Sequence, residues 1–362
     1  MKRRPPTDIL IVKFEALGDV LRTTSLLAPL KRRGPCRISW LTSPAAAPLL
    51  KNNPHLENTL TLRLGDPAAA RRMARRLAGR FDLVLSLEEH PAAASVARAA
   101  CRGKLTGVTI EDGCLAYTPS SARYYDMSLL NRDADGGLKA ANALKAANRL
   151  SYARLWLKIP GLKTPPGRPG PVLRLNARDR AAARRLAKSP AFRKPGPVVA
   201  LNSGAGARWP AKQISEAKAA RIAVALGRAF RGPLLLLGGK ERAEMLRNRR
   251  IAAQVARLDP GIEMILTPYL PLRSFAAMLE LCEVLVTTDS LALHLATALG
   301  RPAVALVGPT SAAELDFHGR GRALQPPEGC ACFYKPRCTR PSPCLDDIAE
   351  SRIVAEVKRC LS

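Results

Sequence analysis

Short apolar runs alternate with longer Ala- and Arg-rich amphipathic segments along most of this 362-residue chain. This alternation is typical of βα units, in which helices connect the strands of a parallel sheet. The pattern therefore predicts an α/β fold. We expect helices to begin near residues 19, 44, 67 and 91, and one longer helix over 137–157. The expected strands are 9–13, 37–41, 82–87, 104–108, 198–202, 234–237, 283–287 and 303–307.

The length and the prolines predict two domains. At about 150 residues a domain, a chain of this size corresponds to two domains or three. Eight prolines lie between residues 160 and 197, around one short basic helical stretch at 177–188, and this composition favours a linker. We expect an N-terminal Rossmann-like domain over 1–160, a linker over 161–196, a second Rossmann-like domain over 197–345 with a Cys-rich loop at 329–345, and a C-terminal helix over 346–362.

The charge is strongly positive and unevenly distributed. The chain has 58 Lys and Arg against 29 Asp and Glu, a formal net charge of +29, and residues 151–250 alone contribute 23 basic and 4 acidic side chains. Such an excess favours polyanionic partners. A nucleic-acid-binding protein is one alternative, but aromatic residues make up only 4% of the chain and do not interleave with the basic stretch. A biased genomic base composition would also explain the Arg and Ala content.

The apolar runs are too short for a membrane span or an export signal. The longest of them are runs such as 234–237, and the run after the basic start covers only 9–12. We therefore expect a cytoplasmic protein, whose nine cysteines are thiols or metal ligands rather than disulfides.

Asp19 is the first candidate for chemistry. It follows the expected strand 9–13 and Gly18, which permits a sharp turn into the next helix. The carboxyl end of the strand is where open α/β sheets bind ligands. A carboxylate here can face a bound ligand, or it can serve only as the N-cap of its own helix.

A Gly-rich loop after the strand 198–202 is the second candidate. It contains Asn202, Ser203, Gly204, Arg208 and Lys212, and Pro210 is expected in the first turn of the next helix. Small residues let backbone amides approach an anion, and the basic side chains add charge. The loop lacks a Walker ending and the full Gly-x-Gly-x-x-Gly spacing, which disfavours ATP hydrolysis and NAD binding. It predicts a phosphate-binding loop.

A third candidate follows the strand 283–287, where the sequence is Thr-Asp-Ser-Leu-Ala-Leu-His. Ser290 is expected to begin a helix whose free amides bind the same anion, and His294 lies about one turn further on. Asp289 precedes the cap. The alternative is an ordinary polar cap followed by a partly buried histidine.

Four cysteines lie within fifteen residues near the C-terminus: Cys330, Cys332, Cys338 and Cys344. Four thiolates in one loop can bind a structural zinc ion, although Cys-x-Cys is tighter than the usual Cys-x2-Cys. Free thiols or a redox-labile pair are the alternatives.

Taken in order, these segments resemble glycosyltransferase family 9, the ADP-heptose:lipopolysaccharide heptosyltransferases. The likeness extends from about residue 9 to 357. The segments that carry it are Leu-Gly-Asp-Val-Leu-Arg-Thr-Thr at 17–24, residues 40–50 with Asn53-Pro54, residues 202–210 ending in Arg-Trp-Pro, Thr-Asp-Ser-x-x-x-His-Leu-Ala at 288–296, Gly-Pro-Thr at 308–310, and the cysteine cluster.

The resemblance implies a GT-B fold, with two Rossmann-like domains whose parallel sheets face a central cleft. It also implies an inverting transfer that needs no metal, from a donor such as ADP-heptose to an anionic glycolipid acceptor at the inner membrane surface. Nucleic acid is not an expected partner. On this template Asp19 matches the catalytic base and Glu241 a carboxylate that holds the donor ribose. Phosphate-contacting positions are matched by Asn202, Ser203, Asp289, Ser290 and His294.

Two positions depart from the family pattern. Ala207 stands where many members have Lys, so that Arg208 or Lys212 must supply that charge, and Leu291 replaces a usual Gly. These changes leave open a different donor, or a member that binds nucleotide with little catalysis.

Overall fold

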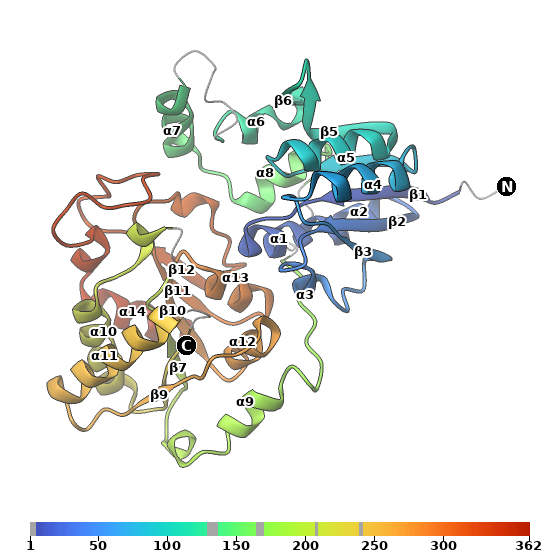
Figure 1. Ribbon diagram of the computed structural model, residues 1–362. Helices are drawn as coiled ribbons and strands as arrows, with labels where there is room; N and C mark the ends of the chain where they lie inside the picture. The colour runs from blue at the N-terminus through green and yellow to red at the C-terminus, as the bar shows by residue number, and fades with distance from the viewer. Residues whose placement is uncertain (1–4, 129–136, 164–169, 207–208, 239–241) are drawn as a thin grey trace. The chain divides into compact units, whose positions relative to one another are not determined.

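A computed structural model describes residues 5–128, 137–163, 170–206, 209–238 and 242–362. The chain divides into two compact units, the first ending at Arg174 and the second beginning at Leu175 (Figure 1). Each unit is an α/β structure with one six-stranded sheet, and each is described by itself.

The sheet of the first unit is parallel except at one edge. Its strand order is β3-β2-β1-β4-β5-β6, and only β6 runs antiparallel to its neighbour. Strands near 9–13, 37–41, 82–87 and 104–108 are confirmed, whereas the sequence reasoning missed β3 and β6. The strands are β1 (Thr7–Val12), β2 (Cys36–Thr42), β3 (Asn58–Thr61), β4 (Phe81–Ser86), β5 (Cys101–Glu111) and β6 (Cys114–Tyr117).

Helices cover both faces of this sheet, because its apolar side chains alternate between two cores. Ile9 and Ile11 of β1 pack in one cluster, and Leu10 and Val12 pack in the other. The helices are α1 (Leu17–Thr23), α2 (Leu27–Arg33), α3 (Ala47–Leu50), α4 (Pro67–Leu77), α5 (Pro91–Ala100), α6 (Ala122–Tyr125), α7 (Gly137–Ala147) and α8 (Tyr152–Lys158).

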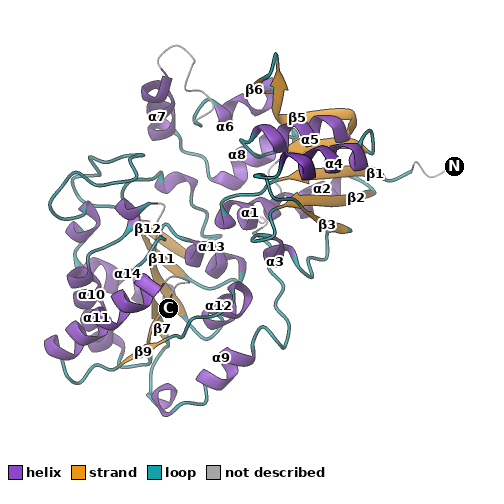
Figure 2. Cartoon of the chain, in the orientation of Figure 1, coloured by secondary structure: helices purple, strands orange, loops and turns teal. Residues whose placement is uncertain are grey.

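The single helix expected over 137–157 is wrong, since α7 and α8 are separate (Figure 2). Asn148 explains the break. Its side-chain oxygen accepts a hydrogen bond from the amide of Leu150 (3.0 Å), and its side-chain amide donates to the carbonyl of Leu150 (2.8 Å). Such local bonds compete with the helix and favour a turn.

The second unit has the same strand order. Its sheet runs β9-β8-β7-β10-β11-β12, and every pairing is parallel. Renumbered within the unit, this is the 3-2-1-4-5-6 order of a Rossmann fold, as in the first unit. The four strands expected in the second half are confirmed; β9 and β12 were missed. The strands are β7 (Val199–Leu201), β8 (Leu234–Leu236), β9 (Met264–Leu266), β10 (Val284–Thr288), β11 (Ala303–Leu306) and β12 (Gly321–Leu324).

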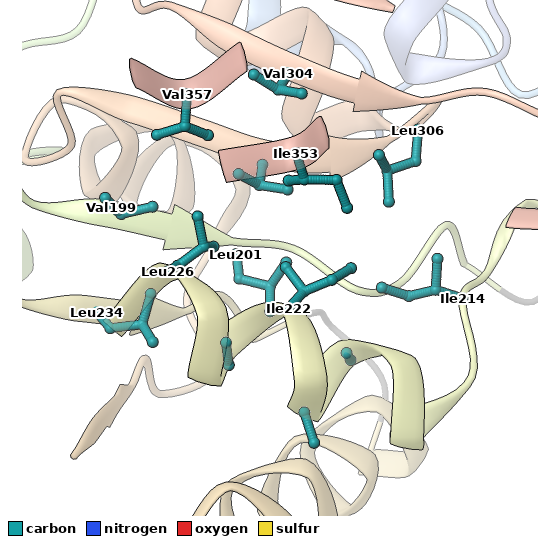
Figure 3. Packing of buried hydrophobic residues seen from close by; sticks show 14 of the residues in the cluster. Val199, Leu201, Ile214, Ile222, Leu226, Leu234, Val304, Leu306, Ile353 and Val357 are labelled. Carbon is teal, nitrogen blue, oxygen red and sulfur yellow. The ribbon is translucent and has the colours of Figure 1, made fainter. Parts of the chain in front are cut away.

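The last helix of the chain completes the core of this unit. Ile353 and Val357 pack with side chains from β7, β11 and α10 in one buried cluster (Figure 3). The helices are α9 (Ala181–Leu186), α10 (Glu216–Phe230), α11 (Arg242–Leu258), α12 (Leu272–Leu279), α13 (Leu291–Ala298) and α14 (Glu350–Leu361).

The segment that begins at residue 175 packs on the second unit and is not a free connection. Asp179 binds the guanidinium of Arg273 on α12 at 2.6 Å, and Arg180 binds the carboxylate of Glu280 at 2.6 Å and 2.8 Å. Because Arg273 is 8% exposed, its partner matters for stability. The structural division therefore falls inside the stretch expected to be a linker.

No helix in the described parts of the chain combines the length and the apolar character needed to cross a membrane.

Candidate functional site

Each sheet reverses its strand order at one place, and the predicted site residues lie at both places. The reversal falls between β1 and β4 in the first unit and between β7 and β10 in the second. At such a point the two connections leave toward opposite faces, so that the carboxyl ends of the strands border a crevice where α/β proteins bind ligands. Asp19 follows β1, and Asn202 and Asp289 follow β7 and β10.

In the second unit, Asn202 joins the two strand ends. Its side-chain amide lies 3.0 Å from the hydroxyl of Thr287 and 3.1 Å from that of Ser290, and it donates to the carbonyl of Gly204 at 2.8 Å. The two hydroxyls are themselves 3.0 Å apart. The structure therefore brings the second and third sequence candidates into one polar cluster.

Asp289 is the electrostatic centre of this cluster. Its carboxylate accepts hydrogen bonds from the Lys212 ammonium (2.7 Å) and the Thr310 hydroxyl (2.8 Å), and His294 Nε2 lies 3.7 Å away. Burial by itself would raise the pKa of Asp289. The nearby charges of Lys212 and His294, with the two hydrogen bonds, outweigh burial and hold the pKa well below its ordinary value. Asp289 is therefore a fixed anion that positions cations.

Ser290 is the N-cap residue of α13, as expected, but its side chain makes no capping hydrogen bond. Its hydroxyl faces Asn202 and Thr287 instead. The amides in the first turn of α13 are consequently not capped by that serine, which suits them to an anion. Leu291 occupies the first helical position and is partly exposed, so its side chain limits how closely an anion approaches.

The Gly-rich loop differs from expectation at its far end. Pro210 begins only a 3-10 turn over Pro210–Lys212, and the α-helix begins at Glu216. Ser215 explains the later start, because its hydroxyl accepts a hydrogen bond from the amide of Lys218 (3.0 Å) and so caps α10 there. The 3-10 turn nevertheless directs Lys212 to Asp289. Ser203 is buried, and Gly204 is partly exposed.

Two of the predicted site residues, Arg208 and Glu241, lie outside the described residues. Thr310 and Thr287 are functional candidates that the sequence reasoning did not select. Thr310 ends the Gly-Pro-Thr segment that follows β11, and its position after a buried strand is the signal that could have found it.

In the first unit, Asp19 is the third residue of α1, and Ala16 is the N-cap residue. The interpretation of Asp19 as the N-cap is therefore not supported. The Asp19 carboxylate lies 3.2 Å from the guanidinium of Arg22, and about a third of its side chain is exposed. Arg22 in turn stacks over the Tyr152 ring at 3.8 Å. Arg22 holds the Asp19 carboxylate in place, and the exposed part of this carboxylate is accessible to a ligand.

Glu88, which the sequence reasoning missed, holds the loop that leads to Asp19. One of its carboxylate oxygens accepts hydrogen bonds from the Lys13 ammonium (3.0 Å) and from the amides of Phe14 (2.8 Å) and Glu15 (3.0 Å). Glu88 follows β4, and the loop follows β1. Two acidic residues directly after an apolar strand were the available signal. Burial raises the pKa of its neighbour, Glu89.

The four clustered cysteines approach one another in pairs. Cys332 Sγ lies 3.5 Å from Cys338 Sγ, and Cys344 is hydrogen-bonded to Cys330. Burial and this neighbour raise the pKa of Cys344 to about 12, whereas hydrogen bonds from Thr339 lower the pKa of Cys332. Across the described ranges, no three His, Cys, Asp or Glu side chains are arranged so that they could hold a metal ion.

The geometry of the second unit can bind a phosphate-bearing ligand. It combines a fixed Lys ammonium, hydroxyls, small residues and the start of α13 at one end of the sheet, which together can stabilise negative charge on a leaving phosphate. The first unit offers a carboxylate, Asp19, at the start of a helix, and a second carboxylate, Glu88, holds the loop before that helix.

Comparisons with known proteins agree with this chemistry. The family model of glycosyltransferase family 9 (heptosyltransferase) matches residues 70–320. No curated protein gives a significant match to the sequence. A glycosyltransferase family 9 structure from Veillonella parvula DSM 2008 is similar with a TM-score of 0.75 at 17% identity, covering 99% of this chain and 98% of that one.

Two solved E. coli structures are also similar. ADP-heptose lps heptosyltransferase II gives a TM-score of 0.64 at 19% identity and covers 98% of both chains. Heptosyltransferase WaaC with ADP gives a TM-score of 0.61 at 16% identity, covering 98% of this chain and 99% of that one. At these identities the likeness concerns the fold.

Proposed function

Because the chain belongs to glycosyltransferase family 9, we propose that it transfers a heptose or a related sugar from a nucleoside diphosphate, with ADP-heptose as the expected donor. The acceptor is a lipopolysaccharide core or a related anionic glycan. The transfer is inverting and needs no metal ion. The observation that carries this proposal is the cluster of Asn202, Lys212, Asp289, Ser290 and Thr310 at the switch point of the second sheet.

This cluster matches the charge that such a reaction creates. When the bond between the sugar and the diphosphate breaks, negative charge develops on the leaving phosphate oxygen. Lys212 is already oriented by Asp289, and the first-turn amides of α13 are available beside Ser290. Groups that are held in place before the reaction need little reorganisation during it. His294, beside Asp289, is a further donor to the same phosphates.

Asp19 is the proposed general base. It takes the proton from the acceptor hydroxyl as that oxygen attacks the anomeric carbon on the side opposite the leaving diphosphate, which inverts the configuration. Its place at the switch point of the first sheet supports this role. Arg22, 3.2 Å away, keeps a positive charge beside the carboxylate and holds it in position.

The acceptor is proposed to be reached at the cytoplasmic face of the inner membrane. Arg71, Arg72, Arg75 and Arg76 of α4 are all exposed, and their spacing places them on one face of the helix. Among the described residues, only one of the four, Arg72, comes within 4.0 Å of a carboxylate, that of Asp66. Such a face suits anionic headgroups.

Structural zinc at the four clustered cysteines is one alternative, and free thiols or a redox-labile pair are the other. Thiolate ligands at about 2.3 Å from a tetrahedral zinc ion would lie slightly farther apart than the 3.5 Å between Cys332 and Cys338. Elemental analysis of the purified protein tests this prediction. Zinc is not proposed to take part in the transfer.

Calorimetry and a transfer assay test the proposed function together. ADP and UDP are titrated against the folded protein, and ADP-heptose and other nucleotide sugars are supplied with a heptose-deficient lipopolysaccharide acceptor. We expect ADP to bind more tightly than UDP, and turnover with ADP-heptose. Binding without turnover by any donor would favour a nucleotide-binding family member, for which Leu291 is the structural argument. Absence of both would refute the proposal.

A further inference from the structure

The five residues between Cys332 and Cys338 contact both segments that supply the partners of Asp289. The amide of Ala211, next to Lys212, donates to the carbonyl of Pro336 (3.0 Å). The amide of Tyr334 donates to the carbonyl of Pro309 (2.7 Å), next to Thr310. Lys212 and Thr310 both donate hydrogen bonds to Asp289. The position of residues 333–337 therefore affects the cluster of Asn202, Lys212, Asp289, Ser290 and Thr310, which we call the phosphate cluster.

Side chains strengthen the same connection. The Tyr334 ring meets the Trp209 ring edge-on, with 6.2 Å between their centroids, and the Lys212 ammonium lies 5.3 Å from the centre of the Trp209 ring. Tyr334 has a φ of 53°, in the left-handed region that residues other than glycine rarely adopt. A bulky residue keeps such a backbone only where its surroundings hold it. Its contacts with Pro309 and Trp209 do this.

The two thiols that bracket the segment are placed for reaction with each other. Their sulfur atoms are 3.5 Å apart, and the amide of Thr339 donates to Cys332 Sγ at 3.2 Å. A disulfide requires the sulfurs to approach to about 2.05 Å. Cys332 is buried, while Cys338 is partly exposed and accessible to a small reagent.

We propose that Cys332 and Cys338 form a reversible disulfide that fixes the 333–337 segment against the phosphate cluster. The oxidant is a low-molecular-mass disulfide. The Cys338 thiolate attacks one of its sulfurs, forms a mixed disulfide and releases one small thiol. The Cys332 thiolate then attacks Cys338 Sγ and releases the second thiol. Two protein thiols are oxidised, and one small disulfide is reduced to two thiols.

The disulfide is expected to strengthen nucleotide binding. Closing the link restricts the segment that orients Lys212 and Thr310, so less ordering is left to occur when the diphosphate binds. This coupling to the nucleotide rests on the proposed function, whereas formation of the disulfide does not. The two can therefore fail separately.

The test compares the full-length protein reduced with dithiothreitol and the same protein equilibrated with oxidised glutathione. Free thiols are alkylated, and the linked peptides are identified by mass spectrometry. We expect a link between Cys332 and Cys338, reversed by dithiothreitol, and an ADP affinity at least threefold higher in the oxidised protein. Cys338→Ser should abolish the link and the gain in affinity. Cys114→Ser, which removes an exposed thiol of the first unit, should leave both unchanged.

Three outcomes would overturn the inference. The first is the absence of the 332–338 link in the oxidised wild type. The second is a link without any change in ADP affinity, which would refute the coupling. The third is one zinc ion per chain that protects all four clustered thiols from alkylation, because the pair would then be metal ligands. If neither the reduced nor the oxidised protein binds ADP, the proposed function fails, while the peptide map still tests the disulfide.

Discussion

The switch points of the two sheets have the same topology but different chemistry. In the first unit a buried carboxylate, Glu88, binds backbone amides and Lys13, and thereby holds the loop before a second, partly exposed carboxylate, Asp19. In the second unit a largely buried carboxylate, Asp289, holds a cation, Lys212, beside the start of a helix that Ser290 does not cap. One arrangement is suited to accept a proton and the other to receive negative charge. A shared fold therefore does not determine the chemistry of its site.

The largest expected effect comes from removing the proposed base. Asp19→Asn keeps the size of the side chain but cannot accept the proton, so turnover should fall at least about a hundredfold. Because Asp19 belongs to the first unit, ADP affinity should not change. Steady-state kinetics and calorimetry on the same preparation measure the two quantities. A fully active Asp19→Asn variant would show that the carboxylate at the first switch point does not act as the base.

Breaking the ion pair of the second unit should affect both stability and binding. Lys212→Met leaves the largely buried Asp289 without the Lys212 ammonium, which costs about 3 kcal/mol of unfolding free energy for pairs of this kind. ADP affinity should fall as well. Urea unfolding and calorimetry measure these effects. Arg228→Met, which removes an exposed cation paired with Asp259 away from the cluster, is the matched control and should change neither by much.

Glu88→Gln should lower kcat by disturbing the position of Asp19, without weakening the binding of ADP. The neutral side chain accepts weaker hydrogen bonds from Phe14 and Glu15 and leaves the buried Lys13 without its counter-ion. We expect a loss of about 2 kcal/mol in stability and a drop in kcat, while ADP binding stays intact. If kcat does not change in the folded variant, the position of Asp19 does not depend on the loop that Glu88 holds.

The smallest effect is an opposite pH dependence of the stability contributions of two partly buried carboxyls, Asp289 and Glu89. The pKa of Asp289 is lowered in the folded protein, so its contribution to stability is complete above its ordinary pKa, about 4, and is lost as the pH falls below that value. The pKa of Glu89 is raised by burial, so its contribution is complete below about 4 and is lost as the pH rises through the raised pKa.

Substitution of Asp289 or Glu89 should reveal these opposite dependences of stability on pH. Relative to the wild type, Asp289→Asn should lose less stability at pH 3 than at pH 6, and Glu89→Gln should gain more at pH 7 than at pH 4. Urea unfolding across this range measures both differences. If the stability difference from the wild type changed with pH in the same direction for both variants, the opposite pKa shifts of Asp289 and Glu89 would be contradicted.

Much of the fold follows from the apolar runs, because buried parallel strands are continuous stretches of Val, Ile and Leu. The strands that the sequence reasoning missed are short and lie toward the edges of the sheets, such as β3, whose residues are mostly exposed and polar. The break at Asn148 depends on a local side-chain bond that periodicity does not show.

The site was predictable to a similar degree. The alternation of strands and helices places Asp19, Asn202 and Asp289 at the ends of strands, and the strand order then brings Asn202 and Ser290 together. Which side chain neutralises which was not predictable. The pairing of Lys212 with Asp289 depends on a single 3-10 turn. The hydrogen bond from the amide of Phe14 to Glu88 joins residues that lie 74 positions apart in the sequence.

The contacts of Asp179 and Arg180 with α12 determine where the two halves can be expressed as separate fragments. A fragment that starts at residue 197, the last of the eight prolines, would lose the carboxylate that neutralises the buried Arg273. One that starts at residue 175 would retain it. The longer fragment should therefore be the more soluble, the more resistant to protease and the better suited to crystallisation with ADP.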